Sequence, residues 1–111
     1  MIPTKEEFYR RIDIKATSEE VKQSSYLSTL AADMAGGDAD DWQNIIRFYR
    51  IDCEKHNMIN EFMKCTGQKL INIFSKVSSD LAKLTMNQNT EYEDLVLFAL
   101  REAALTKNIS L

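Results

Sequence analysis

Apolar residues recur along most of the chain at intervals of three or four positions, the spacing of helices that bury one face. No proline follows Pro3, and the whole sequence holds only three glycines, so few residues interrupt a helix. All-β folds need many turn residues, and this chain lacks them. The pattern therefore predicts an all-α protein.

The starts of three helices are marked by capping boxes, in which a threonine is followed three positions later by a glutamate. The boxes begin at Thr4, Thr17 and Thr90. Gly36-Gly37 predicts a turn, and the acidic stretch after it predicts another helix start. We expect a helical bundle of four to five helices in a single domain, 1–111, with a frayed tail from Asn108 onward. The expected helices span about residues 5–15, 18–35, 41–56, 58–86 and 91–107.

The longest feature is an apolar seam from Trp42 to Leu84, in which steps of four and three residues alternate as in a coiled coil. If 41–56 and 58–86 form one unbroken helix, it is roughly 65 Å long at 1.5 Å per residue. A single small chain cannot cover such a rod, so this alternative predicts a homo-oligomer through the seam. A bend at His56-Asn57 or Thr66-Gly67 instead predicts a monomeric bundle, and we favour the bend.

A second apolar group lies roughly opposite the first half of this seam on a helical wheel. Its members are Phe48, Ile51, Met58, Ile59 and Phe62. A helix that is apolar on two sides is usually buried between neighbours. We therefore expect this part of the chain to be central in the fold.

Composition and charge narrow the class of protein further. The chain is 44% apolar and 28% charged, as expected for a folded domain and not for a disordered chain. Its net charge of −3 argues against a general nucleic-acid-binding surface. No apolar stretch is long enough to span a membrane, and the first residues do not resemble an export signal. We expect a cytoplasmic protein.

Few residues suggest catalysis or metal binding. Cys53 and His56 are spaced to share one face of a helix, with Cys65 or Glu61 as a further hypothetical ligand, but no second close pair completes a zinc site. The carboxylate pairs Asp38/Asp41 and Glu91/Asp94 fall at predicted helix starts, where acidic residues are expected for capping. We therefore predict no metal, no cofactor, no catalytic residue and no enzyme activity.

Residues 47–50 interleave two arginines with two aromatic residues. Arg, Tyr and other aromatic residues are favoured at the centres of protein interfaces, so Arg47, Phe48 and Arg50 are predicted to bind a partner. A simpler interpretation places Phe48 and Tyr49 in the core and leaves the two arginines in solvent.

By elimination, the sequence predicts a small helical interaction module that binds another protein and modulates its activity, of the inhibitor, immunity, adaptor or chaperone type. The alternative is a nucleic-acid-binding or transcription-regulating helical dimer that uses the arginine-rich stretch. Binding that weakens as salt is added would distinguish the second class from the first.

Overall fold

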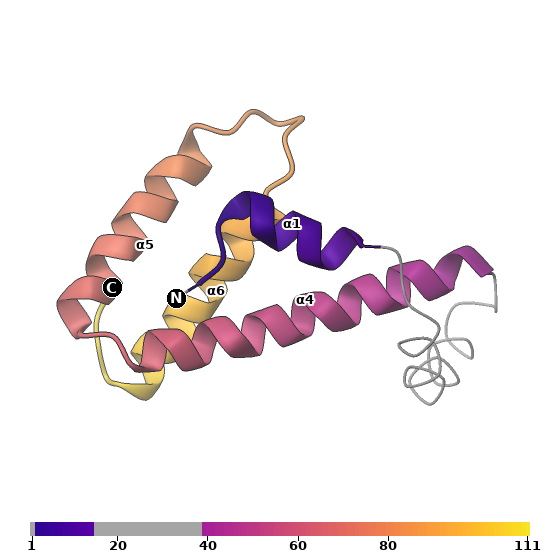
Figure 1. Ribbon diagram of the computed structural model, residues 1–111. Coiled ribbons are helices and arrows are strands. Elements are labelled where there is room, and N and C mark those ends of the chain that lie inside the picture. Colours follow the sequence, from indigo (N-terminus) through magenta and orange to yellow (C-terminus); the bar gives the residue numbers. More distant parts are fainter. Residues whose placement is uncertain (1, 15–38) are drawn as a thin grey trace.

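The structure is a computed structural model that describes residues 2–14 and 39–111, and this part of the chain forms four α-helices (Figure 1). They are α1 (Lys5–Asp13), α4 (Ala39–Met63), α5 (Gly67–Ala82) and α6 (Glu91–Thr106). No strand occurs among the described residues, and the all-α bundle is confirmed. None of these helices combines the length and apolar content that a membrane span requires. The predicted helix 18–35 and the turn at 36–37 lie outside the described residues.

Helix α1 is short and docks through one face. Its nine residues are too few for a stable isolated helix, so packing must hold it. Phe8 and Ile12, one turn apart, are fully buried. At its start the Thr4 hydroxyl accepts a hydrogen bond from the backbone N–H of Glu7 at 3.3 Å, which confirms this predicted cap.

The chain bends between α4 and α5, where residues 64–66 form a turn. Thr66 begins the next helix, because its hydroxyl accepts a hydrogen bond from the backbone N–H of Lys69 at 3.2 Å. The alternative in which 41–56 and 58–86 form one unbroken helix is therefore wrong. Of the two predicted corners, the one at Thr66-Gly67 is confirmed and the one at Asn57 is wrong.

The expected boundaries 41–56 and 58–86 are accordingly corrected to Ala39–Met63 and Gly67–Ala82. Met58 and Phe62 are almost completely buried and carry the apolar face of α4 beyond Asn57. Asparagine is a weak helix former, but its effect of less than about 1 kcal/mol is small beside the burial of two large side chains.

The predicted seam is buried in α5 and exposed in much of α4. Its buried members in α5 are Leu70 and Val77. Its exposed members in α4 are Tyr49, Cys53, His56 and Asn60. Over this stretch α4 packs through the second apolar group instead, which provides Met58 and Phe62. The Trp42 side chain is outside the described part, and the rest of the Trp42 to Leu84 stretch does not form one straight seam.

Helix α6 is the centre of the described fold. It packs against α1, α4 and α5, and in Figure 1 it runs back from the loop after α5 towards the turn between α4 and α5. Its small residues let neighbouring helices approach closely. The buried positions of α6 are Glu93, Val96, Leu97, Ala99, Leu100, Ala103 and Ala104.

The start of α6 is at the predicted position, but the predicted capping box is wrong. Thr90 makes no capping hydrogen bond, and its hydroxyl donates to the Asp94 carboxylate at 2.9 Å. Glu93 turns inward and accepts a hydrogen bond from Lys5 Nζ at 2.5 Å. The Asn89 side-chain oxygen accepts from the backbone N–H of Glu91 at 3.0 Å and takes over part of the capping role.

Hydrogen bonds hold the first residues after α6, so the predicted frayed tail is wrong at Asn108 and Ile109. Asn108 has φ 55°, and the backbone N–H of Ile109 returns to the Ala104 carbonyl at 2.8 Å, the pattern of a Schellman motif. Ile109 then packs against the start of α5. Nearby, Lys107 Nζ donates to the Met63 carbonyl at 3.2 Å and to the Cys65 carbonyl, which satisfies the C-terminal end of α4.

Candidate partner-binding site

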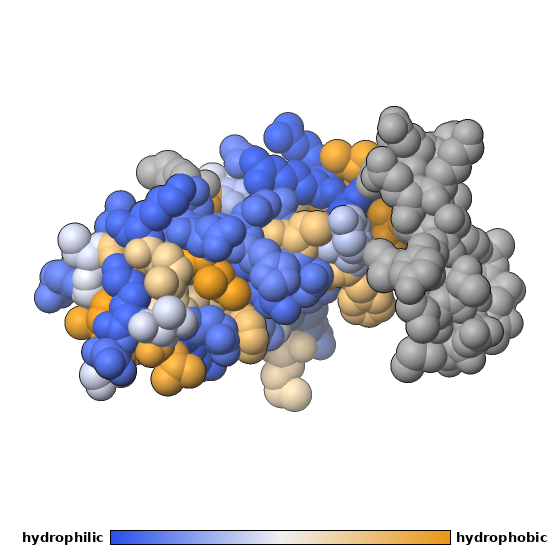
Figure 2. Space-filling view, turned by 90° about the horizontal axis from the view of Figure 1, so that it is seen from below, coloured by the Kyte–Doolittle hydropathy of each residue, from blue (hydrophilic) through white to orange (hydrophobic). Residues whose placement is uncertain are grey.

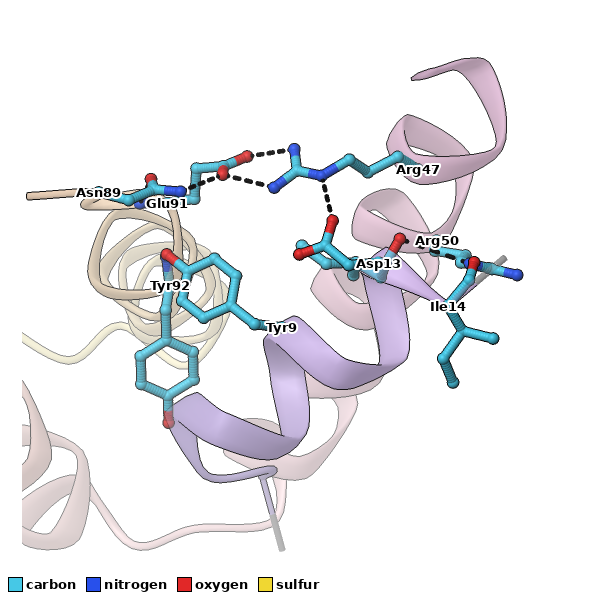
Figure 3. A network of polar contacts seen from close by, with 9 residues as sticks. Tyr9, Asp13, Ile14, Arg47, Arg50, Asn89, Glu91 and Tyr92 are labelled. Atoms are coloured by element: carbon cyan, nitrogen blue, oxygen red, sulfur yellow. Dashed lines mark hydrogen bonds and ion pairs between the residues drawn. The ribbon is translucent and has the colours of Figure 1, made fainter. Parts of the chain in front are cut away.

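Arg47 lies where α4 meets the end of α1 and the start of α6 (Figure 3). Its guanidinium donates two hydrogen bonds to the Glu91 carboxylate, at 2.6 and 2.7 Å, and its Nε donates to Asp13 at 2.8 Å. Such bidentate arginine–carboxylate pairs are among the strongest polar contacts in proteins. Arg47 therefore joins three helices.

This pairing also changes the electrostatics of the junction. Hydrogen bonding to Arg47 is the largest influence on Glu91 and holds the pKa of that carboxyl below its usual range. Asn89 Nδ2 adds a further hydrogen bond at 2.6 Å. Glu91 therefore carries its charge throughout the neutral pH range, and the junction stays intact there.

Arg50 lies one turn further along α4 and supports the end of α1. It donates to the Ile12 carbonyl at 3.4 Å and to the Ile14 carbonyl. The last carbonyls of a helix have no partner within the helix and carry partial negative charge, so a guanidinium stabilises them. Both arginines of the predicted site are thus engaged within the chain.

Two tyrosines extend this junction towards the beginning of the chain. The Tyr9 hydroxyl accepts a hydrogen bond from the backbone N–H of Tyr92 at 3.4 Å, and the Tyr92 hydroxyl donates to the Pro3 carbonyl at 2.7 Å. Burial is the main cause that raises the pKa of both tyrosines. The segment before α1 is therefore tied to α6.

Phe48 and Tyr49 lie beside these arginines in sequence but face outward. Phe48 is 68% exposed and Tyr49 is 53% exposed. The interpretation that buries the aromatic residues and leaves the arginines in solvent is thus reversed by the structure. The assignment of Arg47, Phe48 and Arg50 to a partner interface stays a prediction, with Phe48 the one of the three that presents its apolar surface.

Of the candidate metal ligands, Cys53 and His56 lie on the exposed face of α4, whereas Cys65 lies half-buried in the turn after this helix. Cys53 is an exposed free thiol, and His56 Nε2 lies 3.4 Å from the Asp52 carboxylate. A side-chain hydrogen bond with Cys53 raises the pKa of Tyr49. Among the described residues no group of three or more His, Cys, Asp or Glu side chains could hold a metal ion.

The structure also shows a hollow that the sequence did not indicate. It has a volume of about 330 Å³ and lies between the segment before α1, Arg11 of α1 and the last turns of α4. Glu54 lines it and is only 9% exposed. The missed signal is its spacing, because Glu54 precedes Met58 and Phe62 by four and eight positions and so falls on the buried face of α4.

Apolar surface elsewhere is divided into small areas. On the face seen in Figure 2, apolar residues form separate patches among hydrophilic ones. Small separate patches are normal for a folded protein and do not by themselves indicate an interface. Comparison with known proteins found no matching family model, no matching curated protein and no matching solved structure.

Proposed function

We propose that the protein is a helical interaction module that binds a partner protein and alters the partner's activity, with no catalysis of its own. The observation that carries this proposal is the exposed pair Phe48 and Tyr49 on α4. Two adjacent aromatic side chains that the core does not use can fill a pocket on a partner. Such residues contribute a large share of binding energy at protein interfaces.

The contacts next to this pair support the proposal. Arg47 and Arg50 flank the aromatic residues in sequence and tie the same turns of α4 to α1 and α6. A rigid backbone reduces the ordering cost of binding, so less of the contact energy is lost on association. In this proposal Phe48 and Tyr49 contact the partner, while the two arginines position the helix that presents them.

The test compares capture of binding partners from a native lysate by the wild-type protein and by two variants. Phe48→Ser combined with Tyr49→Ser removes the exposed pair. The control, Leu105→Ser, removes an apolar side chain that is 74% exposed on α6. We expect a partner that the wild type and the control retain and that the double variant binds about 10- to 100-fold more weakly, the range of an interface hot spot.

Circular dichroism must show the same helix content for all three proteins. Equal retention of the partner by the double variant would contradict the assigned surface, and no retained protein at all would contradict the proposed function. A captured nucleic acid that nuclease removes and salt weakens would instead support the alternative helical dimer.

A further inference from the structure

The hollow beside Glu54 contains a polar atom that the described chain does not satisfy. Glu54 is nine-tenths buried, and its Oε2 is covered and accepts no hydrogen bond. A buried carboxylate oxygen without a donor is unfavourable by about 1–3 kcal/mol or more. Native structures contain few such atoms, and each calls for a donor such as water, an ion or a ligand.

The cation next to Glu54 is held loosely. Arg11 lies 3.6 Å from Glu54 Oε1 and 3.7 Å from Glu7 Oε2, and its side chain is 48% exposed. Charge-assisted hydrogen bonds are about 2.7–2.9 Å long, so neither carboxylate forms a good hydrogen bond with Arg11. Another cation can therefore replace Arg11 at Glu54 without breaking a strong contact.

The shape and lining of the hollow define the chemistry that fits. Its volume of about 330 Å³ is far larger than one water molecule, which takes up about 30 Å³ in the liquid. Asn57 and Asn60 also line it. The unsatisfied group is an acceptor, so the ligand must be a donor, and a charged donor gains roughly twice as much as a neutral one.

We propose that this hollow binds a guanidinium or alkylammonium group, which pairs with Glu54 in place of Arg11. The terminal torsion of a glutamate is soft, so the carboxylate can turn and present both oxygens to the incoming group. The opposite wall is formed by the segment before α1, and it is fixed in place because the Tyr92 hydroxyl donates a hydrogen bond to the Pro3 carbonyl at 2.7 Å. This inference does not depend on the partner surface at Phe48.

The test is a titration of the full chain with methylguanidinium and with butylammonium, followed by backbone NMR shifts. We expect saturable shifts around Glu54, Asn57 and Asn60, with a dissociation constant on the order of millimolar, as for a small fragment. Glu54→Gln should weaken binding at least tenfold. The matched control, Asp52→Asn, changes an exposed carboxylate of the same helix that pairs with Lys55 and should leave binding unchanged.

A second variant keeps the proposal falsifiable if Glu54→Gln does not fold. Arg11→Met removes the cation that pairs with Glu54 and should tighten binding several-fold. The absence of shifts at 50 mM ligand, or equal binding by the wild type and Glu54→Gln, would overturn the proposal. Unchanged or weaker binding by Arg11→Met would overturn it as well.

The same titration distinguishes two sources of the cation. A blocked arginine or lysine tripeptide that binds at least tenfold more tightly than the free cation indicates a basic side chain of a partner protein. Equal binding of the two indicates a free small amine or guanidine. Both results support a cation site at Glu54, and they differ only in the molecule that carries the cation.

Discussion

Among the residues that the structure describes, two pairs of opposite charge link α1 to α4, and they differ in geometry. In one, Arg47 of α4 lies 2.8 Å from Asp13 of α1 and also binds Glu91 at 2.6 and 2.7 Å. In the other, Arg11 of α1 stays 3.6 Å from Glu54 of α4. The first pair satisfies its charges, whereas the second leaves a buried oxygen without a donor.

This difference separates a structural contact from a candidate binding site. The guanidinium of Arg47 donates three short hydrogen bonds within the chain, so a ligand would have to compete with them. At Glu54 an incoming donor would satisfy an atom that is otherwise unsatisfied. The same residue types thus stabilise the fold in one place and leave binding capacity in the other.

Loss of the docking of α1 should remove both pairs and give the largest effect. Phe8 is fully buried and packs against Tyr9 and Tyr92. We expect Phe8→Ala to lower the free energy of unfolding by about 3–5 kcal/mol, measured by urea denaturation. Exposed Phe48→Ala should change it by less than about 0.5 kcal/mol. A small effect of Phe8→Ala would show that α1 does not hold the two pairs together.

Removal of the Arg47–Glu91 pair should give the next largest change in the free energy of unfolding. Arg47→Met should destabilise by about 1–2 kcal/mol, below the full value for buried charged hydrogen bonds because Arg47 and Glu91 are 24% and 34% exposed. Urea denaturation at pH 7 measures it. Lys64→Met, which removes an exposed cation 3.4 Å from Glu61, should stay within about 0.5 kcal/mol.

The stability difference between the wild type and Arg47→Met should depend on pH. The pKa of Glu91 is lowered in the folded protein, so its stabilisation is present above the unfolded value of about 4.5 and is lost as the pH falls through the folded value. The gap between wild type and Arg47→Met should therefore be full at pH 7 and shrink below about pH 4.5. A gap that stays constant down to pH 3 would exclude the Arg47–Glu91 pair as its cause.

Removal of the Glu54 carboxylate should change the free energy of unfolding least, and it should raise it. Glu54→Met keeps the side-chain length and removes a buried charge with an oxygen that has no donor, so it should stabilise by about 0.5–1 kcal/mol. The matched change Glu91→Met should destabilise by about 1–2 kcal/mol in the same denaturation assay. Destabilisation by Glu54→Met would mean that Glu54 is satisfied in solution.

Much of the fold could be predicted from local signals. The capping residue Thr4 and the absence of proline after Pro3 indicated helices close to their observed positions. The break at Thr66 was one of two predicted corners. The face of α4 that is buried could not be chosen, because two apolar groups competed and the choice depends on where α1 and α6 pack. Sequence periodicity contains no information on that packing.

The site was less predictable than the fold. Arg47 and Arg50 were singled out for their residue types, but their partners Glu91 and Ile12 are 44 and 38 positions away. The Glu54 hollow needs the segment before α1 as one wall, and no local pattern predicts that placement. Only the spacing of Glu54 within the buried face of α4, which the sequence analysis missed, could have indicated a carboxylate at an unusual position.

The central position of α6 affects the order in which the chain can fold. Its contacts join distant parts of the sequence, as in the Lys5–Glu93 pair, whose members are 88 positions apart. Helix bundles with mostly local contacts fold fastest, and pairings over such distances slow the search. Helix α5 packs mainly against α6, so it gains most of its apolar burial only once α6 has formed beside it, whereas α1 packs mainly against α4. We therefore expect no stable folding intermediate in which α5 is docked before α6.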